Sequence, residues 1–581
     1  MKNTFKKLSV ILAFMAFSCD FTTDLQDPYS LTPAQLDVNY SMNLVQLTFA
    51  DFYSGLHGTV APLVRYNTMT GGYRYQNAYQ PQNQDGLWTT AYQAVLNQTK
   101  FLIPLAEEKN LTTHVAVAKI INAYTLLAMV DLFGDIPLSE ALNPANFNPG
   151  NDDGADVYAA ALALLGEAKI ELAKTGTDAG GPLNRDIYFG TLTTPANRAK
   201  WAALASTLEL KAYVNLGDNA KIATYINTST GALLPGVDLI DNSTPLEQFT
   251  YKYGTATNPA GSRHPVYDQY YGVATGSAGG YYCNYFLYEM FNGSNYTTDG
   301  IGGGTAVQDP RWRYYFYRQV GSIDPNVNGF DLKALGCNPG VPPPNYAGVP
   351  MFCVFEPGFY GRDHGDASGT PPDGPVITTA GVYPAAGRPD NTSLSNATYQ
   401  GLTQRAQGGN GAGILPIWMP EYTEFLKAEI VGRAGNVAAA KGLLLSAINL
   451  SIANVKGYAD SKALPVTIAP WTATTSVGWT NFVSSYTTAV GLAYDAASAK
   501  LDIIGKEFWK ALHGNGYEAY NLYRRTSAPR NMQPTIQANP GPWMRALIYP
   551  SVHVNLNNNA PQRDANVVNK VFWDTNADTL N

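Results

Sequence analysis

A pair of amphipathic helices joined by a short turn limits, more than any other feature, how this chain can fold. Between Pro420 and Val455, apolar residues recur at helical spacing on both sides of Ala434-Gly435-Asn436. The first apolar face holds Tyr422, Phe425, Leu426 and Ile430, and the second holds Val437, Ala440, Leu444 and Ile448. Small alanines let the two helices approach closely, and such a pair is the unit of a tetratricopeptide-like solenoid. No clean period of about 34 residues is visible, so a plain helical bundle is the alternative.

Two further segments are predicted to be helices with buried faces. The run Val115–Val130 is apolar nearly all round and carries one charge, Lys119, as expected for a helix enclosed by neighbours. A second helix should begin at Thr194 and Pro195, in the N-cap and N1 roles, and end before Gly217. Its apolar stripe is expected to be Trp201, Leu204, Leu208 and Ala212.

The composition indicates a well-packed, loop-rich secreted protein. Charged residues make up 14% of the 581 positions, against ~25% in average soluble proteins, while tyrosine, glycine and proline are abundant. The length exceeds the usual limit of a single core, so a large core or two lobes are expected. The net charge is -7 and there is no basic run, which argues against a nucleic-acid partner because phosphate binding needs clustered Lys or Arg.

The N-terminus has the pattern of an export signal. Three lysines precede a ten-residue apolar run, 8–17, which is too short to span a membrane, since spanning needs ~20 residues. Cys19 follows the small residue Ser18, as in bacterial lipoproteins, whose signal is cut before a cysteine that then carries lipid. Ala16 stands where that motif expects leucine or a similar residue. Lipidation of Cys19 is therefore predicted, with an unlipidated cleaved signal and an inert cysteine as alternatives.

Aromatic residues in loops are the first candidates for a ligand surface. Tyr73, Arg74, Tyr75 and Tyr79 lie in a polar stretch led by two glycines, where no helical stripe accounts for them. Tyrosine rings bind sugars or peptides by laying a flat apolar face on the ligand while polar neighbours fix its orientation. Packing of the loop onto the scaffold is the alternative role for each of them.

A second candidate group lies at the start of the segment 361–374. Tyr360 and Arg362 are predicted to touch ligand, and Asp363 and His364 are included with them. Asp363, His364 and Asp366 offer too few donors in the spacing that calcium or zinc requires, so neither a metal nor a cofactor is predicted. Capping of turns and bridging of loops is the alternative for this group.

The remaining cysteines leave a disulfide open. If Cys19 is acylated, Cys283, Cys337 and Cys353 remain, and an odd number cannot all pair internally. A bond between Cys337 and Cys353 would close a ring worth ~3 kcal/mol in the chain-entropy model. Three buried free thiols are the alternative.

The motifs of common hydrolases and nucleotide-binding enzymes do not occur in this sequence. There is no His-Glu-x-x-His helix, Gly-x-Ser-x-Gly elbow or Gly-x-x-x-x-Gly-Lys loop. Glu421, Glu424 and Glu429 fall on helical positions and are predicted to belong to the scaffold. The histidines stand apart in the sequence, at His57, His114, His264, His364, His513 and His553. The chain is therefore not expected to be an enzyme.

The C-terminal part of the sequence resembles a known family. Leu501, Ile504, Phe508 and Leu512 form a helical stripe, and Gly514 and Gly516 are expected to end the helix by adopting positive φ. The whole run LDIIGKEFWKALHGNGYEAYNLYRRTSAP, with the later RALIYP, resembles the C-terminal signature of the SusD/RagB family of nutrient-binding outer-membrane lipoproteins. The phrases FLKAEIVGRAGN and RAKWAALASTLELKAYVNLGD are also similar to that family, in the right order.

The resemblance implies a fold and a function. The fold would be mostly α, a tetratricopeptide-like scaffold of helical pairs with a long loop-rich ligand-binding insertion. The protein would be lipid-anchored and surface-exposed on the outer membrane, with Asp20, Asp24 and Asp27 as the acidic export tag. It would capture oligosaccharides or oligopeptides, glycans being slightly favoured, and deliver them to a SusC-type TonB-dependent barrel. The alternatives are a secreted enzyme that degrades glycans or peptides, and a helical-repeat scaffold that binds only protein.

The expected organisation follows from these features together. Residues 1–18 form the signal peptide and 19–34 the acylated N-terminus and linker. Residues 35–217 form the first part of the helical scaffold, and 218–419 form the loop-rich insertion, since loops this long are usually functional. Residues 420–581 complete the scaffold and carry the C-terminal signature.

Overall fold

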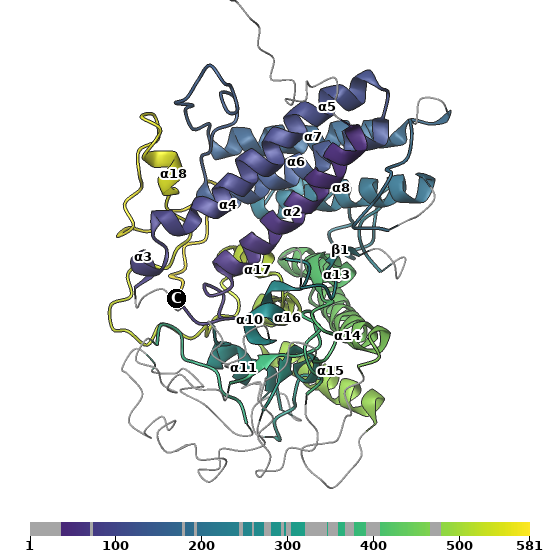
Figure 1. Ribbon diagram of the computed structural model, residues 1–581. Helices are drawn as coiled ribbons and strands as arrows, with labels where there is room; N and C mark the ends of the chain where they lie inside the picture. The colour runs from purple at the N-terminus through teal and green to yellow at the C-terminus, as the bar shows by residue number, and fades with distance from the viewer. Residues whose placement is uncertain are drawn as a thin grey trace, which may run out of the picture.

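The computed structural model describes most of the chain from residue 37 onward. The described residues are 37–69, 74–176, 180–190, 194–242, 248–257, 261–271, 280–291, 296–297, 304–319, 346, 358–366, 377–390, 407–464 and 478–581. Within them helices dominate, and the strands form only two short antiparallel pairs. Figure 1 shows an N-terminal group of helices packed along a C-terminal group, with the insertion at one end.

The N-terminal group forms one half of the scaffold and combines long helices with short ones (Figure 1). They are α2 (Val38–Val60), α3 (Tyr75–Ala78), η2 (Pro81–Gln84), α4 (Asp85–Thr89), η3 (Thr90–Leu96), α5 (Asn97–Glu108), α6 (Thr112–Phe133), α7 (Gly154–Ala173), α8 (Thr194–Leu216) and α9 (Asn219–Ile222). The C-terminal group comprises α13 (Pro420–Arg433), α14 (Val437–Ser461), α15 (Trp479–Ala496), α16 (Lys500–Ala511) and α17 (Gly516–Thr526). The short helix α18 (Ser551–Val554) lies instead against η2 and α4 of the N-terminal group (Figure 1).

The insertion contributes shorter elements. They are β1 (Phe249–Lys252), α10 (Pro265–Tyr271), α11 (Asn284–Phe291), α12 (Trp312–Tyr315), β2 (Phe316–Tyr317), β3 (Thr379–Ala380) and β4 (Ile414–Trp418). β1 pairs with β4, with Lys252 opposite Ile414, and β2 pairs with β3. The β1–β4 pair brings the two ends of the insertion together next to the start of α13.

Helix α6 is the central helix of the N-terminal group. It packs against α2, α5, α7 and α8, which accounts for its apolar surface on every side, as the sequence predicted for 115–130. It ends at Gly134, whose φ is 73°. In the described part of the chain, α6 and α14 are both long and apolar enough to cross a membrane by length and composition, but most of the apolar window in α6 is buried within the fold.

The predicted helical hairpin is confirmed as α13 and α14. The turn lies at Ala434–Asn436, and the Asn436 side chain accepts a hydrogen bond from the Ala439 amide at the start of α14. One residue of the predicted face is wrong. Val437 is 44% exposed because it is the first residue of α14 and lies beside the turn, whereas Ala440, Leu444 and Ile448 are buried as expected.

The C-terminal signature forms α16 and α17. Gly514 has a φ of 94° in the turn between them, as predicted. The same role for Gly516 is wrong, because this residue does not adopt positive φ and instead begins α17. Its lack of a side chain lets α17 approach α2, since an added Cβ would lie 3.0 Å from the His57 carbonyl oxygen.

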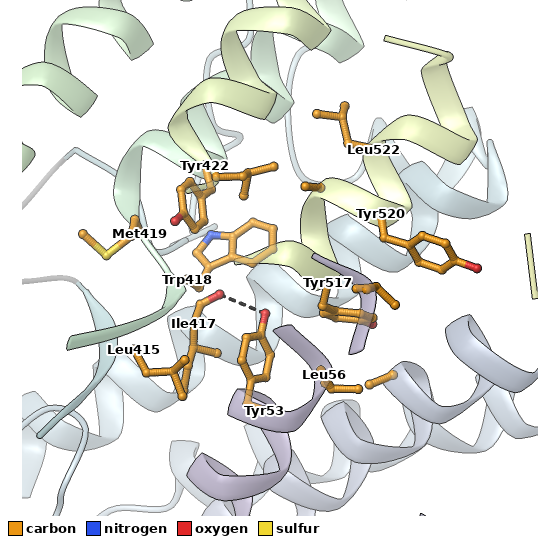
Figure 2. Packing of buried hydrophobic residues seen from close by; sticks show 14 of the residues in the cluster. Tyr53, Leu56, Leu415, Ile417, Trp418, Met419, Tyr422, Tyr517, Tyr520 and Leu522 are labelled. Carbon is orange, nitrogen blue, oxygen red and sulfur yellow. Dashed lines mark hydrogen bonds between the residues drawn. The ribbon is translucent and has the colours of Figure 1, made fainter. Parts of the chain in front are cut away.

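Aromatic residues join the two helical groups where α2, β4 and α17 meet (Figure 2). The Tyr53 hydroxyl donates to the Ile417 carbonyl oxygen at 3.2 Å, and the Tyr53 and Tyr517 rings pack edge to face. Trp418 packs against Tyr422 in the same way. The first half of the scaffold is therefore fixed to the second through buried side chains.

A buried ionic cluster attaches the insertion to α16. Arg311 contacts both Asp309 (2.7 Å) and Glu507 (3.1 Å), and Lys510 contacts Glu507 at 3.0 Å. All four side chains are fully buried. This cluster places the chain around α12 against the C-terminal signature.

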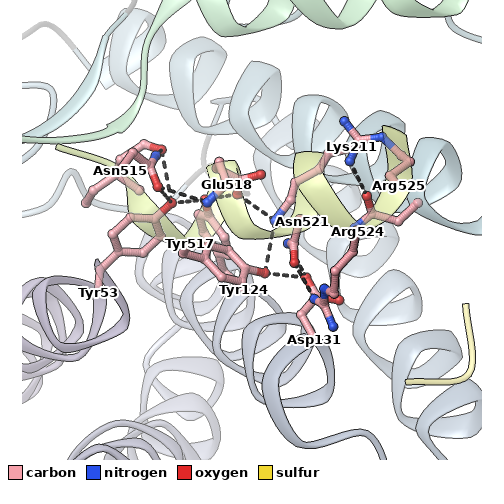
Figure 3. A network of polar contacts seen from close by, with 12 residues as sticks. Tyr53, Tyr124, Asp131, Lys211, Asn515, Tyr517, Glu518, Asn521, Arg524 and Arg525 are labelled. Atoms are coloured by element: carbon pink, nitrogen blue, oxygen red, sulfur yellow. Dashed lines mark hydrogen bonds and ion pairs between the residues drawn. The ribbon is translucent and has the colours of Figure 1, made fainter. Parts of the chain in front are cut away.

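A second buried polar network centres on Asp131 in α6 and connects it to α17 (Figure 3). Its carboxylate accepts hydrogen bonds from Tyr517 (2.5 Å), Asn521 (2.8 Å) and Trp573 (2.8 Å), and also from Tyr158. Nearby, Lys211 in α8 pairs with Glu518 in α17 at 2.7 Å. These contacts hold α6, α8 and α17 in one arrangement.

Candidate ligand-binding surface

Two adjoining hollows lie at the C-terminal end of α2. The first has a volume of about 390 Å³, and its lining includes Met69, Ala78, Tyr79, Asn83 and Gln84. The second has a volume of about 270 Å³, and its lining includes Ser54, Asn67, Thr68, Gln269 and Leu415. Gly58 and Pro62 line both hollows, so the two share a wall. We call them the twin hollows.

Gly58, on the shared wall, has open space where a side chain would lie. A Cβ added to Gly58 would have no atom within 4 Å, so any side chain at this position would extend into open space. Gly58 lies in the last turn of α2, where its backbone φ is ordinary for a helix, so the position does not require glycine for its conformation.

Three residues that line the hollows have a buried polar atom without a partner. Tyr79 and Gln84 line the first hollow, and Thr68 lines the second. The Tyr79 hydroxyl, Gln84 Oε1 and Thr68 Oγ1 have no hydrogen-bond partner in the described part of the chain, although their residues are only 5%, 2% and 3% exposed. Buried polar groups normally find a partner, so these three residues are exceptions, and all three lie at the hollows.

Two histidines contribute to the second hollow, and a third lies next to it. His57 and His264 line it, and His513 precedes its wall residue Gly514. Burial lowers the pKa of His57 to about 4 and that of His264 to about 3, and it lowers the pKa of His513 well below its usual value. All three rings are therefore neutral at pH 7, which gives the hollow a polar but uncharged wall.

The structure separates the first group of predicted ligand residues. Tyr79 lines the first hollow, and Arg74 is exposed just before α3. Tyr75 points inward, where its hydroxyl accepts a hydrogen bond from Arg65 at 3.0 Å and lies 3.5 Å from His364. Tyr73 lies outside the described residues.

The second predicted group is buried beside Tyr75. Tyr360, Arg362, Asp363 and His364 are all less than 8% exposed. Asp363 accepts hydrogen bonds from Asn284 (3.1 Å) and Gln533 (2.8 Å), and the Arg362 guanidinium stacks on Tyr281 with its centre 4.1 Å from the ring centroid. These internal contacts resemble the bridging of loops that the sequence left open, and a direct ligand role for the group stays a prediction.

The cysteine predictions are only partly covered by the structure. Cys283 is a buried free thiol, and burial raises its pKa to about 12. Its Sγ lies 3.3 Å from Gln533 Oε1. Cys19, Cys337 and Cys353 lie outside the described residues.

The acidic residues of α13 are used within the scaffold, as predicted. Glu424 and Asp241 both contact Lys427, and Glu429 pairs with Arg433 and Arg525. Glu421 accepts a hydrogen bond from Asn454. No group of three or more His, Cys, Asp or Glu side chains placed to hold a metal ion occurs among the described residues.

Comparison with known proteins gives a family match for the N-terminal part of the chain. Residues 26–253 match the SusD-like family, described as starch-binding and associating with the outer membrane. In this part of its sequence the chain is similar to SusD-like proteins. No curated protein matches it.

Solved structures share the fold of this chain. A chitin-binding protein is 16% identical with a TM-score of 0.59, over 94% of this chain and 100% of that one. A SusD/RagB family protein from Bacteroides thetaiotaomicron is 14% identical with a TM-score of 0.57, again over 94% and 100%. A chitin-binding SusD homologue from Flavobacterium johnsoniae is 16% identical with a TM-score of 0.56, over 93% and 99%. The predicted tetratricopeptide-like helical scaffold is thereby confirmed.

Proposed function

We propose that this SusD-like protein captures a neutral oligosaccharide in the twin hollows without cleaving it. The observation that carries the proposal is that two adjoining hollows are lined by Thr68, Tyr79 and Gln84, three residues that each have an unpartnered buried polar atom. Sugar hydroxyls both donate and accept, so they can pair with a hydroxyl group and with an amide oxygen alike. Two of the structures with this fold are named for binding chitin, which supports a glycan over a peptide.

The uncharged histidines favour a neutral ligand. At pH 7 the imidazoles of His57 and His264 supply no positive charge to attract an anion. The Nδ1 atoms of the two rings accept hydrogen bonds from the Gly516 and Val266 amides, which fixes the ring orientations. The combined volume of the twin hollows is in the range of small-molecule sites, which accommodates part of an oligomer rather than a whole chain.

A side chain on the shared wall should weaken binding. We expect Gly58→Gln to weaken the affinity for the captured oligosaccharide at least about tenfold, because the new side chain occupies space above both hollows. Isothermal titration with the neutral oligosaccharides that bind best on a glycan and peptide array gives the measurement. Glutamine is a better helix former than glycine, so α2 should not lose stability.

Gly442→Gln in α14 is the matched control. It makes the same change in a helix, at an exposed position where a Cβ meets no atom within 4 Å, away from the twin hollows. Equal affinities of the two variants and the unaltered protein would place the ligand elsewhere. Recovery of shortened oligosaccharide after the titration would show that the protein cleaves its ligand, which contradicts the proposal.

The proposal extends to the membrane. Cys19 is the proposed site of lipid attachment, and a SusC-type TonB-dependent barrel is the proposed receiver of the ligand, because these features accompany the family that the sequence resembles. Radiolabelled palmitate should label the protein in cells, and Cys19→Ala should remove the label. Persistent labelling of this variant would exclude Cys19 as the anchor.

A barrel protein should co-purify after mild detergent extraction, and isolation of the SusD-like protein alone at native abundance would count against the complex.

A further inference from the structure

The second of the twin hollows has an uncharged lining. Its described lining residues include no Asp, Glu, Lys or Arg. The two histidines among them, His57 and His264, are neutral at pH 7 because burial lowers their pKa values. A carboxylate or an ammonium group would find no counter-charge there, and placing an unpaired charge in such a hollow is costly. The hollow is therefore suited to an uncharged polar group.

Two side-chain amides in this hollow are free to bind a ligand. Asn67 and Gln269 both line the hollow, and both residues are half-buried rather than closed off from solvent. Neither amide has a hydrogen-bond partner within the described part of the chain. Each amide offers an NH₂ donor and a carbonyl acceptor. A ligand in the hollow can therefore both accept from and donate to its lining.

The backbone holds the two amides next to the same stretch of chain, 280–282. Asn67 lies opposite Tyr282 in an antiparallel bridge. Gln269, in α10, packs against Gly280, where an added Cβ would lie only 2.3 Å from Gln269 Nε2. The glycine thus provides the room that the Gln269 amide occupies.

Apolar side chains complete the lining of the second hollow. Pro62, Pro265 and Val266 line it without being fully buried, and Leu415 lies with them. A sugar hydroxyl would pair with the amides but would leave this apolar surface without a contact. An acetamido group carries a carbonyl acceptor, an N–H donor and a methyl group, so it can use the amides and the apolar surface together.

We propose that the second hollow binds the acetamido group of an N-acetylated amino sugar. The carbonyl oxygen of this group accepts from the amide of Asn67 or Gln269, its N–H donates to the amide oxygen of the other, and its methyl group contacts the apolar lining. The C=O and N–H of a trans amide point in opposite directions, so the group needs two separate partners. This inference rests on the proposed function, since it specifies which sugar the twin hollows capture.

Two neutral oligosaccharides of equal length and linkage test the inference by titration calorimetry. Tetra-N-acetylchitotetraose carries an acetamido group on each ring where cellotetraose carries a hydroxyl group. The acetylated probe should bind with saturation. Cellotetraose should bind at least about tenfold more weakly, because it leaves the amide pairing incomplete and the apolar lining bare. Equal affinities for the two probes would overturn the inference.

Gln269→Met locates the preference in the second hollow. Methionine keeps nearly the length of glutamine but has no amide, so the affinity for the acetylated probe should fall about tenfold while that for cellotetraose stays unchanged. Gln93→Met is the matched control, since Gln93 is exposed on η3 and lines neither hollow. A preference for the acetylated probe that survives Gln269→Met would overturn the inference. The melting temperatures of both variants establish that they are folded.

The outcomes separate this inference from the proposed function. If cellotetraose binds as tightly as the acetylated probe and Gly58→Gln weakens both, the acetamido site is overturned while capture in the twin hollows stands. If the acetylated probe binds and neither Gly58→Gln nor Gln269→Met weakens it, both proposals are overturned. If neither probe binds, the acetamido site is overturned, and the glycan array alone decides whether another neutral oligosaccharide is captured.

Discussion

Replacing Arg311 with methionine is expected to lower the free energy of unfolding by about 3–5 kcal/mol, because it strands two buried carboxylates. Asp309 and Glu507 would then share only Lys510, with no access to water. Burial alone would raise the pKa of Asp309, yet Arg311 and Lys510 hold it below the usual value. Urea unfolding of the whole protein, followed by fluorescence, gives the measurement.

The sign of the pH dependence gives a second check on Arg311. A carboxyl whose folded pKa is depressed stabilises the fold above its unfolded pKa, and this contribution is lost as pH falls. Without Arg311 the folded pKa of Asp309 should rise, so protonation relieves the stranded charge in the variant. The difference in stability between the variant and the unaltered protein should therefore shrink from pH 7 to pH 5.

Two further proteins separate charge from packing at this cluster. Adding Glu507→Gln to Arg311→Met removes one of the stranded charges and should restore part of the lost stability. Arg530→Gln is the control, since Arg530 is half exposed and its ion pair with Asp502 should contribute less than about 1 kcal/mol. A loss below about 1 kcal/mol for Arg311→Met would mean that the insertion is not held by this cluster.

The helical scaffold could be predicted from sequence because its signals are local. Apolar spacing and capping residues determined α6, α8, α13 and α14 to within a few residues, and Gly514 marked the turn after α16. The prediction was wrong at Val437 and Gly516, because the exposure of the first and the backbone conformation of the second depend on tertiary neighbours. The first lies beside a turn, and the second lies against α2.

The candidate site could be predicted only in part, because its residues converge from distant segments. Tyr79 was identified from a loop-like run of tyrosines, but Thr68 and Gln84 carry no motif and gain interest only as unpartnered wall atoms. His57, His264 and His513 stand apart in the sequence, and only the fold gathers them at the second hollow. Nor did the sequence show that Asp363 and His364 would be enclosed by the chain near Gln533.

Asp131 attaches the apolar helix α6 to other elements through its buried carboxylate. It follows directly after the predicted apolar run of α6, and it is the acceptor on which Tyr158, Tyr517, Asn521 and Trp573 converge. These four donors come from α7, α17 and the C-terminal chain. A residue that looked like the end of a pattern thus connects the central helix to the C-terminal signature.

Asp131→Ala is accordingly expected to lower the free energy of unfolding by at least about 3 kcal/mol, since it leaves four buried donors without an acceptor at about 1–3 kcal/mol for each group that stays unsatisfied. Asp131→Asn should cause a smaller loss of unfolding free energy than Asp131→Ala. Its amide oxygen still accepts hydrogen bonds, whereas its NH₂ group opposes the remaining donors. Asp495→Ala is the control, since its half-exposed carboxylate has one surface ion pair. Hydrogen exchange should show the loss first at α17 and around Trp573, which the network joins to α6. If Asp131→Ala and Asp495→Ala unfold at the same urea concentration, the carboxylate is not what holds these elements together, and packing around Tyr53 and Tyr517 must account for the junction.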